Sequence, residues 1–205
     1  MQDNTNHFNA AANTWDTDEA ILRTSVFAAA LKKHLVDQKV SKILDFGCGT
    51  GLLAEHFLDI CPHILGIDTS QGMLEKFILR FKNQPHVECL ALNLEQEPLP
   101  HEIGSFDVIM SSMAFHHLKN PKNILELLKK TLKPQGVIFI IDLDQEDGTF
   151  HPDNKSMGVE HFGFSSEELE SWAKQLDFKS FTHEIIFEID KNNRTYRVGL
   201  GIFKS

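Results

Sequence analysis

Short hydrophobic runs recur along the first 143 residues of the chain, and amphipathic segments separate most of them. Val, Ile, Leu and Phe dominate these runs, which is typical of strands buried on both faces of a sheet. The predicted strands are residues 41–46, 63–68, 86–92, 106–111 and 136–143. Because strands that alternate with helices form a parallel, doubly wound sheet, the pattern predicts an α/β fold.

Apolar residues spaced three and four apart predict helices around these strands. One helix covers residues 19–36, ahead of the first strand. A second begins after Ser70, a good N-cap residue, and runs to residue 81. A third covers residues 120–132, where an asparagine cap is followed by a proline in the first turn.

The last sixty residues depart from this alternation. A loop over 144–164 leads to a helix that begins with the capping box Ser165-x-x-Glu168. Two segments of alternating apolar character, 180–190 and 195–203, then flank a polar turn and predict a β-hairpin.

Three glycines follow the first predicted strand, in the run Ile-Leu-Asp-Phe-Gly-Cys-Gly-Thr-Gly at 43–51. Glycine has no Cβ, so such a loop lets the backbone approach a ligand closely. The dinucleotide fingerprint G-x-G-x-x-G would need glycine at position 52, where the chain has Leu52. Asp68 ends the next strand, where a carboxylate can accept hydrogen bonds from both hydroxyls of a ribose.

The run at 43–51 resembles the first motif of class I S-adenosylmethionine (SAM)-dependent methyltransferases, (I/V)LD(I/L)GCGTG. Residues 64–74 and 106–118 are similar to two later motifs of the same family, in particular to its small-molecule, type 11 members. The resemblance implies a Rossmann-like, doubly wound sheet of seven strands with the last strand antiparallel. It also implies SAM as cofactor and S-adenosylhomocysteine (SAH) as product.

The resemblance also implies which residues form the site. Residues 7–16 are similar to an N-terminal segment that folds over the cofactor in this family. Asn93 stands where the family more often has an aspartate beside the adenine, and Glu95 is the competing candidate for that contact. His116 is the candidate general base, although His117 could equally face the acceptor. The expected cofactor contacts are Trp15, Asp45, Gly47, Cys48, Gly49, Gly51, Asp68, Thr69, Met73, Asn93, Leu94, Ser111, Ser112 and Met113.

Composition narrows the choice of partners and compartment. The net charge of −9 and the dispersed basic residues argue against a nucleic-acid partner. The three cysteines form no C-x-x-C pair, no apolar run is long enough to span a membrane, and the polar N-terminus is no secretory signal. We therefore expect a cytoplasmic protein.

No metal site is expected from the sequence. The acidic loop at 142–151 is the only segment that suggests calcium, and its spacing fails the EF-hand pattern, which needs glycine where Asp147 stands.

These observations predict one methyltransferase domain over residues 1–205. Its expected parts are N-terminal cap helices (1–38), a SAM-binding core (39–143) and an acceptor-side loop, helix and hairpin (144–205). The predicted function is methyl transfer from SAM to a small-molecule acceptor by direct displacement. The alternatives are a non-catalytic SAM-binding or regulatory module and a nicotinamide-dependent reductase, which Leu52 and the terminal hairpin disfavour. The acceptor and the oligomeric state stay open.

Overall fold

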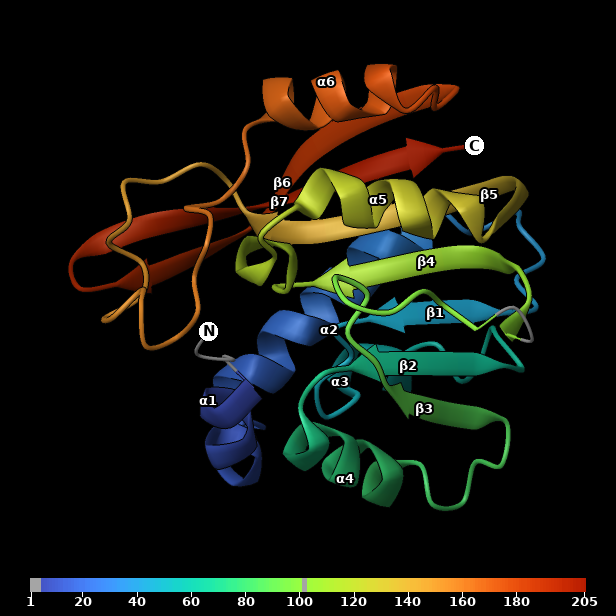
Figure 1. Cartoon of the computed structure of the whole chain (residues 1–205), viewed down its shortest axis with the longest axis horizontal. Coiled ribbons are helices and arrows are strands. Elements are labelled where there is room, and N and C mark those ends of the chain that lie inside the picture. The colour runs from blue at the N-terminus through green and yellow to red at the C-terminus, as the bar shows by residue number, and fades with distance from the viewer. Residues whose placement is uncertain (1–4, 101–102) are drawn as a thin grey trace.

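The structure is a computed structural model that describes residues 5–100 and 103–205. The first four residues of the expected cap lie outside this range. Seven strands of the described chain form one sheet in the order β3-β2-β1-β4-β5-β7-β6 (Figure 1). The strands are β1 (Ile43–Phe46), β2 (Ile64–Asp68), β3 (Val87–Ala91), β4 (Phe106–Ser112), β5 (Leu132–Leu143), β6 (Ser180–Lys191) and β7 (Arg194–Lys204).

Helices precede and connect the strands. The described helices are α1 (Thr5–Ala11), η1 (Ala12–Thr14), α2 (Asp18–Lys33), α3 (Leu52–Glu55), α4 (Gln71–Arg80), η3 (Phe115–His117), α5 (Pro121–Lys130) and α6 (Ser166–Gln175). Their caps follow the sequence signals: the hydroxyls of Ser70 and Ser165 accept hydrogen bonds from the third residues of α4 and α6. The predicted helices are therefore present, with ends that differ by a few residues.

Strands β1 to β5 pair in parallel, and β7 runs antiparallel between β5 and β6. This confirms the predicted Rossmann-like sheet with an antiparallel last strand. The turn from β6 to β7 places Asn192 and Asn193 at φ angles of 53° and 58°. Asparagine tolerates this left-handed conformation, which a tight hairpin turn requires at both central positions.

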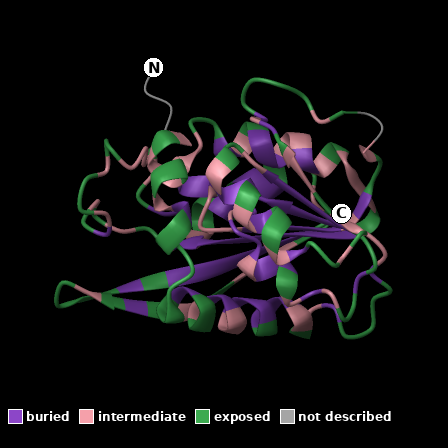
Figure 2. Ribbon diagram, turned by 90° about the horizontal axis from the view of Figure 1, so that it is seen from below, coloured by how far each residue is buried: buried purple, intermediate pink, exposed green. Residues whose placement is uncertain are grey.

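Two hydrophobic clusters cover the two faces of the sheet. Residues of α2, α3 and α4 pack on one face, and residues of α5 and α6 pack on the other. Alternate residues of each central strand serve the two clusters; for example, Ile43 belongs to the first and Leu44 to the second. The central strands are consequently buried, while the outer sides of the helices and the hairpin tip are exposed (Figure 2).

Strand β5 begins earlier than its hydrophobic run predicts. The expected start was residue 136, but the strand begins at Leu132 and includes Pro134 and Gln135. Gln135 has a φ of 68°, and the pairing with β4 shifts register between Phe106 and Val108. Such an irregularity accommodates a proline, which has no N–H to donate to the ladder.

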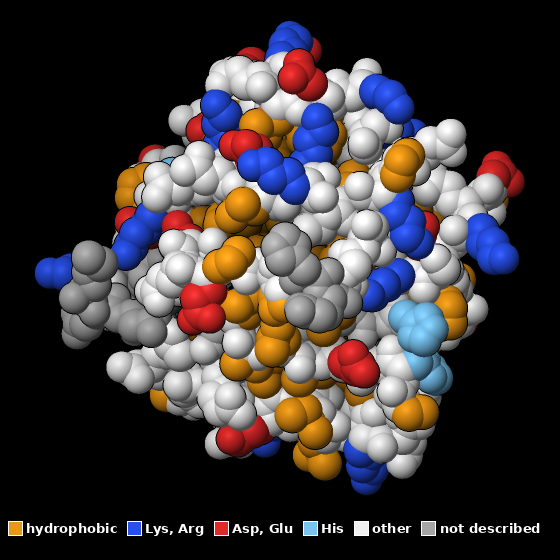
Figure 3. Space-filling model, turned by 45° about the vertical axis from the view of Figure 1, so that its right-hand side comes forward, with side chains coloured by type: hydrophobic (Ala, Val, Ile, Leu, Met, Phe, Trp, Pro, Cys, Tyr) orange, Lys and Arg blue, Asp and Glu red, His pale blue; other side chains and the backbone are white. Residues whose placement is uncertain are grey.

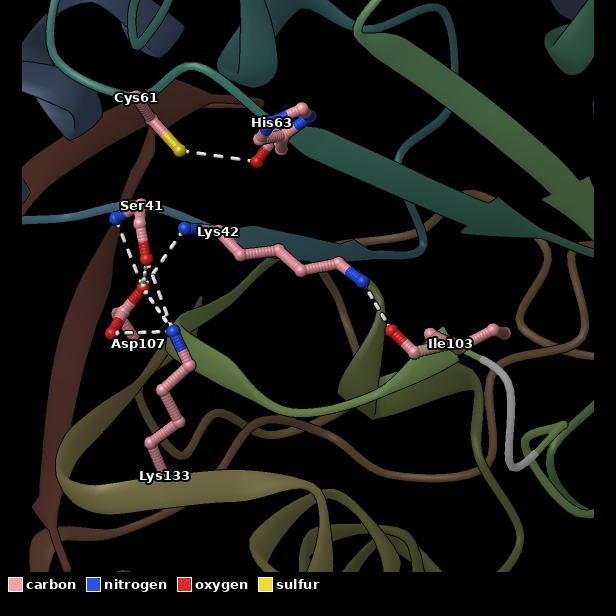
Figure 4. Close-up of polar contacts among 7 residues, drawn as sticks. All are labelled: Ser41, Lys42, Cys61, His63, Ile103, Asp107 and Lys133. Carbon is pink, nitrogen blue, oxygen red and sulfur yellow. Dashed lines mark hydrogen bonds and ion pairs between the residues drawn. The ribbon is translucent and has the colours of Figure 1, made fainter.

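Asp107 connects the amino ends of the central strands (Figure 4). Its Oδ2 accepts hydrogen bonds from Ser41 N, Ser41 Oγ and Lys42 N at 2.6–2.9 Å. Lys133 Nζ lies 2.9 Å from the same oxygen and joins β5 to this group. Burial opposes ionisation, but these donors outweigh it and lower the pKa of Asp107 to about 2.

We predict that Asp107→Asn lowers the free energy of unfolding by about 1–2 kcal/mol at pH 7, after allowance for solvent screening. Because the folded-state pKa is depressed, this contribution is fully present above the unfolded pKa near 4 and is lost as the pH falls towards 2. Urea unfolding of wild type and variant at pH 7 and pH 3 measures this difference in the free energy of unfolding. The account is wrong if wild type and variant differ by the same amount at both pH values.

Candidate active site

The sheet order reverses between β1 and β4, and a cavity opens there at the carboxyl ends of β1, β2 and β4. Doubly wound sheets bind their ligands at this position. Helix α1 and the loop between β5 and α6 lie beyond the same edge of the sheet (Figure 1). The cavity is lined by Phe8, Trp15, Ala20, Arg23, Thr24, Asp45, Phe46, Gly47, Cys48, Gly49, Thr50, Leu52, Leu53, Ile67, Asp68, Thr69, Met73, Leu92, Asn93, Leu94, Glu95, Ser112, Met113, Ala114, His117 and Leu118.

The glycine loop after β1 forms one wall of this cavity. The N–H groups of Gly47 and Cys48 both donate to Ile67 O, at 2.8 and 3.1 Å, so the loop is attached to the end of β2. A Cβ at Gly47 would stand 2.5 Å from that of Ala114, which makes glycine necessary there. At Gly49, with a φ of +53°, an added Cβ would meet no atom within 4 Å. The backbone at Gly49 is therefore open to a ligand.

Asp68 lies at the end of β2 and holds this loop in place. Its Oδ2 accepts the N–H of Gly49 at 2.8 Å, and its Oδ1 accepts the N–H of Ser70 at 2.8 Å. Ser70, and not Asp68, is the N-cap of α4. Burial raises the pKa of Asp68, and the backbone hydrogen bonds oppose that rise. Each carboxylate oxygen keeps a lone pair for a hydroxyl donor.

Asp45, at the end of β1, is a buried carboxyl without a partner on one oxygen. Its exposed fraction is 1%, and Oδ2 makes no hydrogen bond. Burial first, and the nearby Asp68 second, raise the pKa of Asp45 to about 8. A buried, unsatisfied carboxyl is costly, so this part of the cavity fits a cationic ligand group.

Arg23 of α2 brings a positive charge to the same cavity. Burial lowers its pKa, and its ion pair with Glu19 is long, at 4.0 Å. The sequence predicts α2 as an amphipathic helix but does not show which of its residues face the cavity. Ala20, Arg23 and Thr24 were missed for that reason, because the direction of a helix face depends on how the helix docks.

The N-terminal segment, residues 5–17, covers the cavity with aromatic side chains. Phe8 makes edge-to-face contacts with Trp15 and His117, with ring centroids 5.7 and 5.1 Å apart. All three rings line the cavity. The structure therefore brings together Trp15 and the glycine loop, as the sequence predicted.

Polar contacts fix this segment to the core. Asn9 Oδ1 accepts hydrogen bonds from Ser70 Oγ and Gly72 N at 2.7 and 2.9 Å. The carboxylate of Asp16 accepts from Thr50 Oγ1 and Arg80 at 2.6 and 2.5 Å. Asp16 is thus occupied by these partners and is not among the cavity-lining residues.

Asn93 and Glu95 both line the cavity, but each already has a structural partner. Asn93 Oδ1 accepts the N–H of Glu95 at 3.0 Å. Glu95 Oε1 accepts the N–H groups of Lys119 and Asn120, at 2.9 and 3.0 Å, just before α5. Among the described residues the NH₂ group of Asn93 has no such role, so of the two Asn93 has more hydrogen-bonding capacity left for a base.

Two predicted contacts lie outside the cavity wall. Gly51 has a φ of +86°, and a Cβ there would stand 2.5 Å from the ring of Phe81 and 2.9 Å from that of Phe77. Packing against α4, and not ligand binding, explains this glycine.

Ser111 is buried within β4, between Phe46 and Ile140 of the neighbouring strands, and only Ser112 reaches the cavity.

The two consecutive histidines of η3 have different surroundings. His116 is 1% exposed and does not line the cavity; its Nδ1 lies 2.6 Å from Asp142 Oδ1. His117 lines the cavity, and its Nδ1 donates to Gly158 O at 3.0 Å. Burial, and then the neighbouring His116, lower the pKa of His117 to about 3. His117, and not His116, is therefore the histidine of η3 that lines the cavity.

The other predicted contacts all line the cavity: Trp15, Asp45, Gly47, Cys48, Gly49, Asp68, Thr69, Met73, Asn93, Leu94, Ser112 and Met113.

None of the helices in the described part of the chain is long and apolar enough to cross a membrane.

Comparison with known proteins supports this arrangement. Residues 44–140 match the family model described as a methyltransferase domain. An uncharacterized methyltransferase of Schizosaccharomyces pombe is 39% identical over 136 residues, which cover 59% of this chain and 47% of that protein. A tRNA U34 carboxymethyltransferase of Pseudoalteromonas atlantica is 27% identical over 158 residues, 73% of this chain and 48% of that protein. The chain spans about half the length of these curated relatives.

The fold also matches a solved structure over its whole length. The N-methyltransferase NodS from Bradyrhizobium japonicum, in complex with SAH, has a TM-score of 0.73 and 17% identity over 99% of each chain. At this identity the likeness concerns the fold. The matched family domain and this fold make the chain similar to the class I SAM-dependent methyltransferases, a family whose cofactor is SAM.

Proposed function

We propose that this protein binds SAM in the cavity at the carboxyl ends of β1, β2 and β4 and transfers the methyl group to a small-molecule acceptor. One observation carries the proposal: a single cavity joins the glycine loop and Asp68 to the aromatic cover formed by Phe8, Trp15 and His117. A cofactor and a second ligand would then meet in one space that the N-terminal segment shields from water.

The residues of the cavity fit the chemical groups of SAM. Asp68 has lone pairs for the two ribose hydroxyls, and the open side of Gly49 allows close approach of the backbone. The unpartnered carboxyl of Asp45 suits the ammonium of the methionine part, and Arg23 suits its carboxylate. The amino-acid end of SAM would therefore find opposite charges on both of its ionised groups.

When bound, SAM supplies a methyl group already activated by the positive sulfur. The protein then mainly has to align the acceptor, because correct positioning alone removes much of the barrier. A pKa of about 3 makes His117 a weak base at neutral pH, so its contribution would be to orient and enclose the acceptor. The assignment of His116 as general base stays a prediction.

Other functions have less support from the described residues. Position 52, where a dinucleotide fingerprint needs glycine, carries Leu52 in the first turn of α3, which disfavours the reductase. A non-catalytic SAM-binding module would need no space for a second ligand beside the methyl group, whereas Phe8 and His117 line such a space here.

A relative is named as a tRNA enzyme. Here, however, the net charge is −9 and basic side chains lie among acidic ones on the face shown in Figure 3.

Asp68→Ala should weaken SAH binding by about 1.5–3 kcal/mol, because charged hydrogen bonds to the ribose are lost. Calorimetric titration measures the change. Asp37→Ala, at an exposed aspartate outside the cavity wall, is the control and should bind as wild type does. Unchanged affinity of the Asp68 variant for SAH would show that Asp68 does not bind the ribose.

Gly49→Val should abolish SAH binding, since the new side chain would extend into open cavity space; the φ of +53° also strains the backbone of this variant, and the control shares that strain. Gly104→Val is matched to it, because Gly104 also has a positive φ (+75°) and open surroundings but lies outside the cavity wall. Circular dichroism confirms the fold of both variants. Retained binding by the Gly49 variant would mean that the glycine loop is assigned wrongly.

SAH binding at pH 7 should release close to one proton, because Asp45, with a pKa of about 8, is mostly protonated until a cationic ammonium arrives. The affinity for SAH should therefore fall as the pH decreases below about 8, because protonated Asp45 cannot pair with the ammonium. Calorimetry in two buffers of different ionisation enthalpy measures the release. Asp45→Asn should eliminate it, and a release that persists in this variant would refute the assignment.

A further inference from the structure

Three histidine side chains converge beside the cavity, and one of them, His117, lines it. His116 and His117 belong to η3, and His151 belongs to the loop between β5 and α6. Their ring centroids are 4.0–6.0 Å apart, and one nitrogen from each ring lies within 4.8 Å of the other two. We call this group the histidine cluster.

The ring of His116 is oriented by a carboxylate behind it. Asp142 Oδ1 lies 2.6 Å from Nδ1 of His116 and also accepts the N–H of Leu143 at 2.7 Å. Asp142 Oδ2 accepts the N–H of His116 at 3.2 Å. The proton is thereby placed on Nδ1, and the lone pair is on Nε2, which is buried and has no partner. Histidines that bind metal ions are oriented in this way by a carboxylate.

The other two rings also offer free nitrogens. His117 donates from Nδ1 to Gly158 O, which places its remaining lone pair on Nε2. His151 Nδ1 is buried without a hydrogen bond. The same loop contains three more buried, unpartnered atoms: Glu146 Oε1, Asn154 Oδ1 and His161 Nε2. Because an unpartnered buried polar atom is costly, the free nitrogens of His116 and His151, whose rings lie side by side, indicate a ligand.

We propose that the histidine cluster binds a divalent transition-metal ion, with Zn²⁺ as the best match. Three imidazoles and no thiolate are the donor set of a zinc site that keeps its fourth position open. Tetrahedral coordination with Zn–N bonds near 2.0–2.1 Å brings ligand nitrogens to about 3.3 Å from one another. The rings would therefore have to close by about 1.5 Å at most, and His151 is carried by a loop.

The position of the ion suggests its use. His117 lines the cofactor cavity, so the open coordination position would face the acceptor. There the ion would lower the pKa of a hydroxyl or thiol, whose proton would leave to solvent. The freed electron pair would form the bond to the methyl carbon as the C–S bond breaks, leaving its electrons on sulfur. This use of the ion rests on the proposed function, whereas metal binding itself does not.

The proposal departs from the expectation that the chain has no metal site. The acidic loop suggested only calcium, and His151 shows no metal-ligand spacing relative to His116 and His117. The cluster forms because the loop returns to η3: the N–H groups of Glu160 and His161 both donate to His116 O, at 2.9 and 3.0 Å. That contact is tertiary and leaves no sequence pattern.

Competition between the metal-stripped protein and a chromophoric chelator for Zn²⁺ tests the proposal. Wild type should bind one Zn²⁺ tightly, and His151→Ala and His117→Ala should each bind at least about 100-fold more weakly, since each removes a direct ligand. His63→Ala is the control, because His63 is exposed at the opposite edge of the sheet, before β2. Circular dichroism confirms that the variants fold.

Co²⁺ substitution identifies the donor atoms. We expect the visible bands of a nitrogen-ligated, four-coordinate ion without an intense sulfur-to-cobalt band. Failure of wild type to compete for Zn²⁺, wild-type affinity in folded His151→Ala, or a sulfur-to-cobalt band would overturn the proposal. A parallel titration with SAH separates the two claims: SAH binding without Zn²⁺ binding contradicts only the metal site, and the reverse contradicts only the cofactor assignment.

Discussion

The carboxylate of Asp68 is the contact on which the architecture of the site depends. It accepts one backbone N–H from Gly49 of the glycine loop and one from Ser70 at the start of α4. The end of β2, the loop after β1 and the beginning of α4 are therefore held by one charged group. Hydrogen bonds to an ionised acceptor are stronger than neutral ones, and burial strengthens them further. These two hydrogen bonds thus connect three backbone segments where the ribose is proposed to bind.

The cover over the cavity is attached to the same framework. Asn9 binds to Ser70 and Gly72 at the start of α4, and Asp16 binds to Thr50 of the glycine loop. Phe8 and Trp15 are the sequence neighbours of these two anchors, so a change at the loop would also move their rings. On the acceptor side, the loop between β5 and α6 is attached to η3 through His116 O. The two segments meet at His117, where Phe8 contacts its ring.

The sequence predicted what depends on local pattern. Strands and helices follow hydrophobic periodicity and capping residues. The glycine loop and Asp68 each belong to a short motif at the end of a predicted strand, so both could be proposed as site residues without coordinates. Gly51 was grouped with Gly47 and Gly49 although its neighbours are the rings of Phe77 and Phe81, which only the docking of α4 brings there. Arg23 was missed because the sequence shows that α2 is amphipathic but not which residues face the cavity. The histidine cluster was missed because His151 reaches η3 only through the course of a long loop.

The central claim is that the cavity binds the SAM family of cofactors, and calorimetric titration of the purified protein with SAH, with NADH as the comparison, tests it most directly. The account predicts one SAH site per chain with affinity in the micromolar range or tighter and no heat from NADH. Heat from NADH and none from SAH would contradict it and would favour a nicotinamide-dependent enzyme.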